Sequence, residues 1–155
     1  MTDRIEVEVE EPAWDAALAD AAGLARIAAE AALEDADIPT GGVAVLLTGD
    51  EAVRELNARF REKDTATNVL SFPAAAMPGE NGPENHLGDV ALAYGVCARE
   101  AAEQGKTLAA HLQHLVAHGV LHLVGFDHET DDEAQTMEAR ERQILGRLGV
   151  ADPYA

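Results

Sequence analysis

The sequence predicts an α+β fold in which helices pack on a small mixed sheet of about four strands. Strand patterns end at residue 94, and from residue 96 onward the chain carries only helical patterns. With 155 residues, 47% of them hydrophobic, the chain is long enough for one sizeable core and too short for two. We therefore expect residues 1–155 to form a single domain.

The first half of the chain alternates strand and helix patterns. IEVEVE alternates apolar and acidic residues, as a half-buried strand does, and Pro12 ends it. An alanine-rich run with an apolar stripe then predicts one helix, which Gly23 weakens. GGVAVLLTG is a short apolar strand between glycines, and Asp50 is placed to cap the helix after it. These elements occupy residues 5–10, 13–36, 41–49 and 50–61.

The second half holds two more strands and then helices. NVLSF is typical of a strand, which Pro73 stops, and LGDVALAY is the strand that follows a loop rich in proline and glycine. Gly105 is a stop signal for the next helix, Thr107 is a cap for the long helix after it, and TDDE is a capping box for the last. The strands occupy residues 68–72 and 87–94, the loop 73–86, and the helices 96–104, 107–124 and 130 onward.

Composition excludes several classes of protein. The N-terminal MTDRIEVEVEEPAWD is charged where a signal peptide needs an apolar core, and no apolar stretch approaches the roughly 18 residues of a membrane helix, so we expect a cytoplasmic protein with no membrane partner. The lone Cys97 cannot form an internal disulfide, so any metal ion must rest on histidine or carboxylate. Neither GxGxxG nor a Walker loop occurs, so we expect no nucleotide cofactor.

The formal net charge of -18 disfavours a polyanionic partner such as nucleic acid, but basic residues gather locally. Four of the eleven lie within ten positions, at Arg54, Arg59, Arg61 and Lys63. The Debye length is about 8 Å at physiological salt, so a phosphate at this patch interacts more strongly with the nearby cations than with remote acidic residues. Two alternatives stay open: the acidity reflects a salty cytoplasm, and the cations suit the dipole at a helix C-terminus.

Five of the six histidines fall between residues 111 and 128, and three fit the spacing H-x-x-x-H-x-x-G-x-x-H. His118 and His122 project from one helix face on adjacent turns. Gly125 can end that helix in a left-handed conformation, so that the chain swings back and His128 supplies a third nitrogen. Three neutral imidazoles leave one coordination position open, as in catalytic zinc sites, so we predict one Zn2+ per chain on a zinc-hydrolase-like histidine helix.

The polar neighbours of these histidines leave alternatives open. His111 and His114 share a helix face with His118, either as partners that orient imidazoles or as polar surface. The spacing is similar to that of the metzincin proteases, but Gly119 stands where their general-base glutamate follows the first histidine, which counts against that mechanism. Nearby acids either substitute for this base or, as we favour, stabilise a helix N-terminus. They are Asp127, Glu129, Asp131 and Asp132.

The chain resembles the YbeY family of bacterial endoribonucleases and ribosomal RNA maturation factors. The matching segments are LNARFREKDTATNVLSFP, LGDVAL, HGVLHLVGFDH followed by DDEAQTMEARE, and the terminal LGVADPY. They cover most of the chain from about residue 56 onward, whereas the first 50 residues match only in pattern. The histidine segment is highly specific, while LGD and DPY alone would be weak.

The resemblance implies a zinc ion held by His118, His122 and His128, and an arginine important for activity at Arg61. It also implies a single-strand-specific, metal-dependent endoribonuclease that acts in 16S ribosomal RNA 3'-end maturation and ribosome quality control. Its partners would be ribosomal RNA and ribosomal proteins or the small ribosomal subunit. One departure is Glu62, which replaces the usual glycine after the arginine and puts a carboxylate beside the predicted phosphate site.

Three functions compete on these observations. The leading hypothesis is hydrolysis of RNA phosphodiesters, in which the ion activates water and Arg61 offsets the charge of the transition state. The second is a peptide or amide hydrolase that uses the metzincin-like histidines with an unusual base. The third is a ribosome-assembly factor in which zinc is a structural staple and the acidic surface docks on basic ribosomal proteins.

Overall fold

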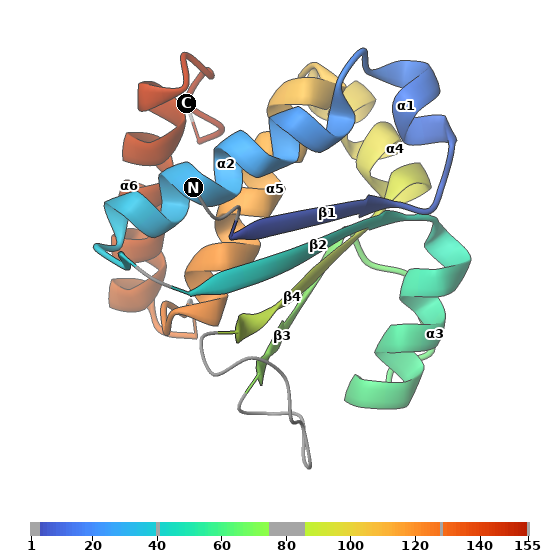
Figure 1. Ribbon diagram of the computed structural model, residues 1–155, viewed down its shortest axis with the longest axis horizontal. Coiled ribbons are helices and arrows are strands. Elements are labelled where there is room, and N and C mark those ends of the chain that lie inside the picture. The colour runs from blue at the N-terminus through green and yellow to red at the C-terminus, as the bar shows by residue number, and fades with distance from the viewer. Residues whose placement is uncertain (1–3, 40, 75–85, 128, 155) are drawn as a thin grey trace.

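The computed structural model confirms the predicted α+β fold with a four-stranded mixed sheet (Figure 1). It describes residues 4–39, 41–74, 86–127 and 129–154. The strands are β1 (Ile5–Val9), β2 (Gly42–Thr48), β3 (Val69–Pro73) and β4 (His86–Ala93). They lie in the order β1-β2-β4-β3, with β1, β2 and β4 parallel and β3 antiparallel to β4. Strand β3 is therefore an edge strand.

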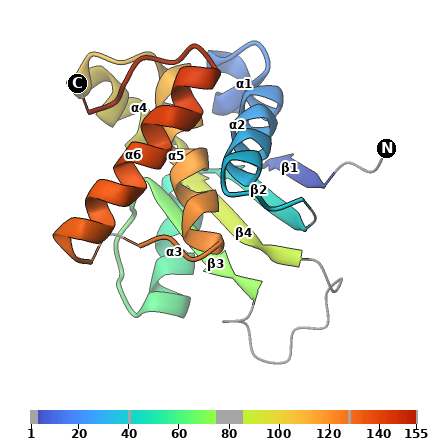
Figure 2. The same ribbon diagram turned by 90° about the vertical axis from the view of Figure 1, so that its left-hand side faces the viewer.

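Six helices flank the sheet in the described part of the chain. They are α1 (Ala13–Ala17), α2 (Ala21–Asp35), α3 (Asp50–Arg61), α4 (Tyr94–Gln104), α5 (Leu108–Leu123) and α6 (Asp131–Arg147). Helices α2, α5 and α6 lie on one side of the sheet and α3 on the other (Figures 1 and 2). The largest fully buried side chains include Ile5, Leu47, Leu92, Leu112 and Leu121, between the sheet and its helices. None of these helices is long and apolar enough to cross a membrane.

The alanine-rich segment 13–36 forms two helices, so the prediction of one helix is wrong. Leu18 is extended, with φ of -128° and ψ of 133°. Asp20 then caps α2, because its side chain accepts a hydrogen bond of 3.0 Å from the Gly23 backbone N–H. The break gives the short helix α1 its own direction, in which Trp14 is fully buried. A side-chain cap and the burial of an aromatic ring therefore outweigh the helix propensity of alanine.

Asp50 lies in the first turn of α3, with Gly49 at the N-cap, so the prediction that Asp50 caps this helix is wrong. Its carboxylate accepts a hydrogen bond of 3.0 Å from the backbone N–H of Val96 and contacts Arg99 at 3.3 Å. Asp50 thus caps α4, which begins at Tyr94, earlier than predicted. The contact joins two helices far apart in sequence, which a local pattern does not reveal.

Three other predicted helix boundaries are confirmed. Gly105 ends α4 in the left-handed conformation, with φ of 67°. Thr107 caps α5 by accepting a backbone N–H of its first turn at 3.1 Å. Thr130 and Glu133 form the capping box of α6. Of the predicted loop, residues 75–85 lie outside the described residues.

Helix α3 ends at Glu62, whose backbone is left-handed, with φ of 58° and ψ of 27°. This conformation brings the Cβ of an L-residue close to the following carbonyl oxygen and costs roughly 1–2 kcal/mol, whereas glycine adopts it freely. The glycine usual at this position in the resembling family therefore suits the backbone better than the glutamate found here.

We predict that Glu62→Gly raises the free energy of unfolding by about 1 kcal/mol, because relief of the left-handed strain exceeds the entropy that glycine adds to the unfolded chain. Glu55 is the matched control, since it is an exposed glutamate inside the same helix. Glu55→Gly should lower the free energy of unfolding by about 1 kcal/mol. Urea denaturation checks both changes, and a less stable Glu62→Gly variant would contradict the assignment of strain.

Candidate active site

Helix α5 packs tightly against the sheet at Gly119. A Cβ placed on Gly119 would lie 2.7 Å from Val90 Cγ1 and 3.1 Å from Ser71 Oγ. Ser71 and Val90 are paired residues of β3 and β4, so the helix backbone rests directly on this strand pair. The Ser71 hydroxyl donates a hydrogen bond of 3.1 Å to the Gly119 carbonyl. A Cβ at this position requires the helix or the strands to move, so the glutamate of a metzincin is disfavoured sterically as well as absent from the sequence.

His118 and His122 lie on one face of α5, on either side of this contact. Their ring centroids are 4.7 Å apart and the rings are nearly perpendicular, at 80°. Gly125, which follows the helix, has the predicted positive φ, at 105°, and the next residue, Phe126, donates its backbone N–H to the Leu121 carbonyl at 3.0 Å. The chain therefore turns back where the spacing predicted it.

Arg61, the last residue of α3, reaches the same region from the other side of the sheet edge. Its Nη2 donates a hydrogen bond of 2.8 Å to the Ser71 carbonyl, and its guanidinium carbon lies 5.9 Å from the centre of the Phe72 ring. Ser71 therefore contacts both parts of the site: its hydroxyl bonds to the backbone of helix α5, and its carbonyl accepts a hydrogen bond from Arg61. One of the five N–H donors of the guanidinium is used in this bond.

A cavity of about 850 Å³ lies where α3, β3 and the end of α5 meet. It brings together the predicted residues Arg61, His118 and His122. Among the described residues, the other ionisable side chains that line it are Lys63, Asp127 and Glu129. Glu62 is not among the described lining residues, and its expected place beside a phosphate site stays a prediction.

For the four acidic residues near the histidines, the sequence left two roles open: general base or stabiliser of a helix N-terminus. The structure separates these residues into two pairs. Asp131 and Asp132 lie in the first turn of α6, where a carboxylate stabilises the helix dipole, as we favoured. Asp127 and Glu129 line the cavity beside the histidines. For these two residues the choice between a base and a helix stabiliser stays open.

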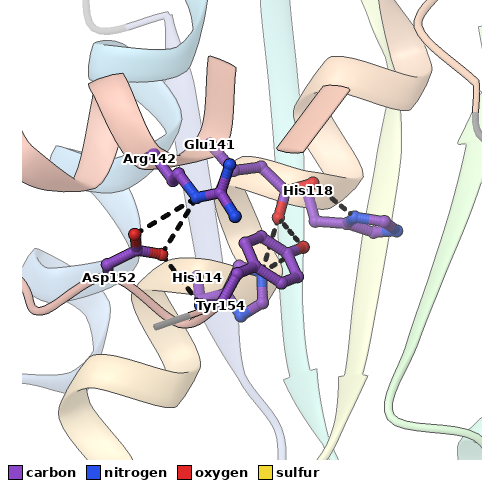
Figure 3. A network of polar contacts seen from close by, with 6 residues as sticks. All are labelled: His114, His118, Glu141, Arg142, Asp152 and Tyr154. Carbon is purple, nitrogen blue, oxygen red and sulfur yellow. Dashed lines mark hydrogen bonds and ion pairs between the residues drawn. The ribbon is translucent and has the colours of Figure 1, made fainter. Parts of the chain in front are cut away.

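Behind the histidines lies a buried carboxylate, Glu141 of α6, with 1% of its surface exposed (Figure 3). Its Oε2 accepts a hydrogen bond of 2.9 Å from Nδ1 of His118. Its Oε1 contacts both Nε2 of His114 and the hydroxyl of Tyr154, each at 2.5 Å. Because Nδ1 of His118 donates its N–H to the anionic carboxylate, Nε2 is the nitrogen that this ring offers to a metal ion.

The hydrogen bonds fix the ionisation state of this carboxyl group. Burial alone would raise the pKa of Glu141, but the hydrogen bonds from its three partners outweigh burial and lower this pKa from 4.5 to about 2. Burial, followed by the contact with Glu141, raises the pKa of the Tyr154 hydroxyl above its ordinary value of 10.0. Glu141 is therefore an anion and Tyr154 a proton donor at neutral pH.

The two other histidines of α5 are buried, so the alternative that they form polar surface is wrong. His114, with 9% exposed, shares the Glu141 carboxylate with His118, as expected of a residue that orients an imidazole. His111, with 3% exposed, instead contacts Glu100 of α4 at 2.9 Å. Burial lowers the pKa of His111 more than this carboxylate raises it.

Glu141 and Tyr154 received no role from the sequence. One signal was present for Glu141: it falls at helical spacing with the apolar Met137, Ile144 and Leu145, which places a charge on the buried stripe of α6. A charged residue on such a stripe indicates a buried partner. For Tyr154 no local signal exists, since only the folded chain brings residue 154 to residue 141.

The donor chemistry fits a zinc ion as far as the described residues extend. Imidazole nitrogen is a preferred zinc ligand. The other ring nitrogen of a zinc-binding histidine commonly donates its N–H to a carboxylate, as His118 does to Glu141. The third predicted ligand, His128, lies outside the described residues. Within the residues that are described, no group of three or more metal-ligating side chains is assembled. The site of three histidines and the role of Arg61 therefore stay predictions.

Comparison with known proteins gives consistent matches along the whole chain. A family model described as "Endoribonuclease YbeY" matches residues 6–149. The "Endoribonuclease YbeY" of Maricaulis maris (strain MCS10) is 54% identical over 151 residues, which cover 97% of this chain and 91% of that protein. The protein of the same name from Azorhizobium caulinodans is 53% identical over 154 residues, covering 97% of this chain and 96% of the relative.

A solved structure also resembles the chain. The solution structure of TM1509 from Thermotoga maritima has a TM-score of 0.58 and 24% sequence identity, over 97% of this chain and 95% of that one. At this identity the likeness supports the fold alone.

The close packing at Gly119 leads to a prediction. Gly119→Ala should lower the free energy of unfolding by about 1–3 kcal/mol, because the added methyl group overlaps Val90 and the helix must move away from β3 and β4. Gly146 is the matched control, since it lies in helix α6 with nothing within 4 Å of its Cβ position. Gly146→Ala should leave stability unchanged or raise it by up to about 1 kcal/mol. Thermal unfolding compares the two, and equal melting temperatures would contradict the steric account.

Proposed function

The chain belongs to the Endoribonuclease YbeY family, and on that premise we propose that it is a metal-dependent endoribonuclease that hydrolyses phosphodiester bonds of single-stranded RNA. The observation that carries the proposal is that a cationic side chain, Arg61, and two imidazoles, His118 and His122, line one open cavity. Phosphodiester hydrolysis needs a group that binds the phosphate and a centre that activates the nucleophile, and this cavity offers residues suited to each.

In this proposal His118, His122 and His128 hold a single zinc ion. When bound, zinc acts as a Lewis acid toward a phosphoryl oxygen and lowers the pKa of water. Glu141 keeps the His118 ring in the tautomer and orientation that a metal ligand requires, through its hydrogen bond with Nδ1. Gly119 lets α5 lie close enough to the sheet for both imidazoles to reach the cavity.

Arg61 and Lys63 bind the scissile region of the RNA in this proposal. The guanidinium of Arg61 is planar and can hold two phosphate oxygens at once, and it offsets the negative charge that grows in the transition state. Its bond to the Ser71 carbonyl fixes its position before the substrate arrives. Lys63 adds a positive charge at the same wall of the cavity.

The substrate and partners that we propose are those the family resemblance implied. They are ribosomal RNA, with 16S 3'-end maturation and ribosome quality control as the setting, together with ribosomal proteins or the small ribosomal subunit. The net charge of -18 supports contact with basic ribosomal proteins, since an acidic surface is complementary to them.

The close packing at Gly119 disfavours a base at the position that metzincins use. The second hypothesis, a peptide or amide hydrolase, therefore depends on an unusual base, for which Asp127 and Glu129 line the cavity. The third hypothesis, a zinc-stapled assembly factor without catalysis, differs from an enzyme in one respect. A binding factor cannot yield a variant that keeps zinc and fold yet loses cleavage. Of the two variants below, the first tests zinc dependence and the second uses this difference.

The first is His122→Ala, which removes one proposed zinc ligand. We expect the parent protein to carry zinc and the variant to lose it, with cleavage of unstructured RNA reduced by about 100-fold or more. His86→Ala is the control, since His86 contacts Asp89 at the start of β4 and does not line the cavity. Metal analysis by mass spectrometry beside a cleavage assay gives the answer, and a metal-free parent with full activity would refute zinc dependence.

The second is Arg61→Ala, which should keep the zinc content and the fold while cleavage falls by about 100-fold, because transition-state charge is no longer offset. Arg59→Ala is matched to it, since Arg59 belongs to the same helical turn but lines a different cavity. We expect Arg59→Ala to cleave RNA at nearly the parent rate. Unchanged cleavage by Arg61→Ala would show that the arginine has another role.

A further inference from the structure

The C-terminal residues of the described chain fold back onto the histidine helix. We call residues 152–154 the C-terminal clasp. Arg142 of α6 contacts the Asp152 carboxylate at 3.1 Å, and the same carboxylate accepts the Tyr154 backbone N–H at 2.8 Å. The Arg142 guanidinium also lies 5.2 Å from the centre of the Tyr154 ring. The clasp is therefore tied to α6 by an ion pair and a cation–π contact, and the hydrogen bond between Tyr154 and Asp152 holds it together internally (Figure 3).

These contacts aim the Tyr154 hydroxyl at the Glu141 carboxylate. The Tyr154 ring meets the His114 ring edge-on, with centroids 5.5 Å apart and an interplanar angle of 87°. Arg142 covers the ring as well, so the phenol has little freedom to turn. Its hydroxyl donates to Oε1 of Glu141 and also lies 3.2 Å from Nε2 of His114. The clasp and His114 thus hold one carboxylate oxygen from two directions.

The other oxygen of the same carboxylate holds His118. A carboxylate is planar, and its last torsion is a broad, weakly restrained rotation when nothing pins it. Fixing Oε1 therefore fixes Oε2, which accepts a hydrogen bond of 2.9 Å from Nδ1 of His118. Glu141 is 1% exposed, so bulk water does not reach it to replace a lost partner.

We propose that the C-terminal clasp is a positioning element of the metal centre, in which Tyr154 acts through Glu141 to hold His118 with its Nε2 ready to bind zinc. This inference rests on the proposed function, and it assigns a task to the DPY segment that the family resemblance left unexplained. Tyr154 touches neither metal nor substrate in this account, and its effect passes entirely through the carboxylate.

The charged groups around Glu141 also support this proposal. Within the described residues its basic partners are the two histidines, and no lysine or arginine forms an ion pair with it. A buried carboxylate without such a partner is stabilised further by a divalent ion one imidazole ring away. Thermodynamic coupling is reciprocal: if docking of the clasp raises the affinity for zinc, bound zinc stabilises the docked clasp by the same free energy.

The experiment measures zinc affinity of the full chain by competition with a chromogenic chelator. Tyr154→Phe removes only the hydroxyl and keeps the ring against Arg142 and His114. We expect its zinc affinity to fall by about 10-fold, within the range seen when a ligand's hydrogen-bond partner is removed. Tyr94→Phe is the matched control, because the Tyr94 ring packs on Trp14 elsewhere in the fold, and its affinity should equal that of the parent.

Two further measurements separate positioning from a general loss of stability. Long-range proton–nitrogen NMR on the metal-free protein should find the His118 proton on Nδ1 in the parent and divided between both nitrogens in Tyr154→Phe. In a double-mutant cycle with Glu141→Gln, the Tyr154→Phe change should cause no additional loss of zinc affinity. The reason is that Glu141→Gln already removes the carboxylate through which Tyr154 acts on His118. Losses that multiply in the double variant would overturn the inference.

The outcomes distinguish this inference from the proposed function. A parent that binds zinc and cleaves RNA, with a Tyr154→Phe variant of equal zinc affinity and an unchanged His118 tautomer, overturns the inference alone. A parent that neither binds zinc nor cleaves RNA overturns the proposed function and this inference together.

Discussion

The contact between Gly119 and the Ser71–Val90 pair is the constraint on which the site depends. The absence of a side chain lets α5 rest on β3 and β4, and the Ser71 hydroxyl holds it there at 3.1 Å. The Ser71 carbonyl holds Arg61 at the same time. One serine on an edge strand therefore sets the distance between the arginine of one helix and the histidines of another, on opposite sides of the sheet.

Local signals carried most of what the sequence predicted. The glycine that ends α4, the capping box of α6 and the shared helix face of His118 and His122 each depend on residues within a few positions, and these appear as expected. The break between α1 and α2 was missed although its cap, Asp20 to Gly23, is local. Two other misses involve distant partners. Asp50 caps a helix whose Val96 lies 46 positions away, and Tyr154 meets His114 across 40. Such contacts exist only after folding, so no periodicity or spacing in the chain announces them.

The cavity resolves the conflict between an acidic chain and an anionic substrate. A net charge of -18 repels RNA at long range, but this repulsion is screened within about 8 Å at physiological salt. Arg61 and Lys63 line the cavity, and in the proposed function they contact the phosphate inside that distance. Recognition in the proposed function therefore depends on short-range, directional bonds to phosphate rather than on the electrostatic steering that strongly basic nucleases use.

The edge of the sheet has a second property that follows from its pairing. The Asn68 carbonyl accepts the Ala93 backbone N–H, so along β3 the bonded pairs alternate and the backbone groups of Val69 and Ser71 face outward. The Val69 N–H is taken by the side chain of Asn68, and the Ser71 carbonyl by Arg61. Two of the four outward groups, the Val69 N–H and the Ser71 carbonyl, are thus already bonded and do not pair with a strand from another chain, which disfavours edge-to-edge association at this strand.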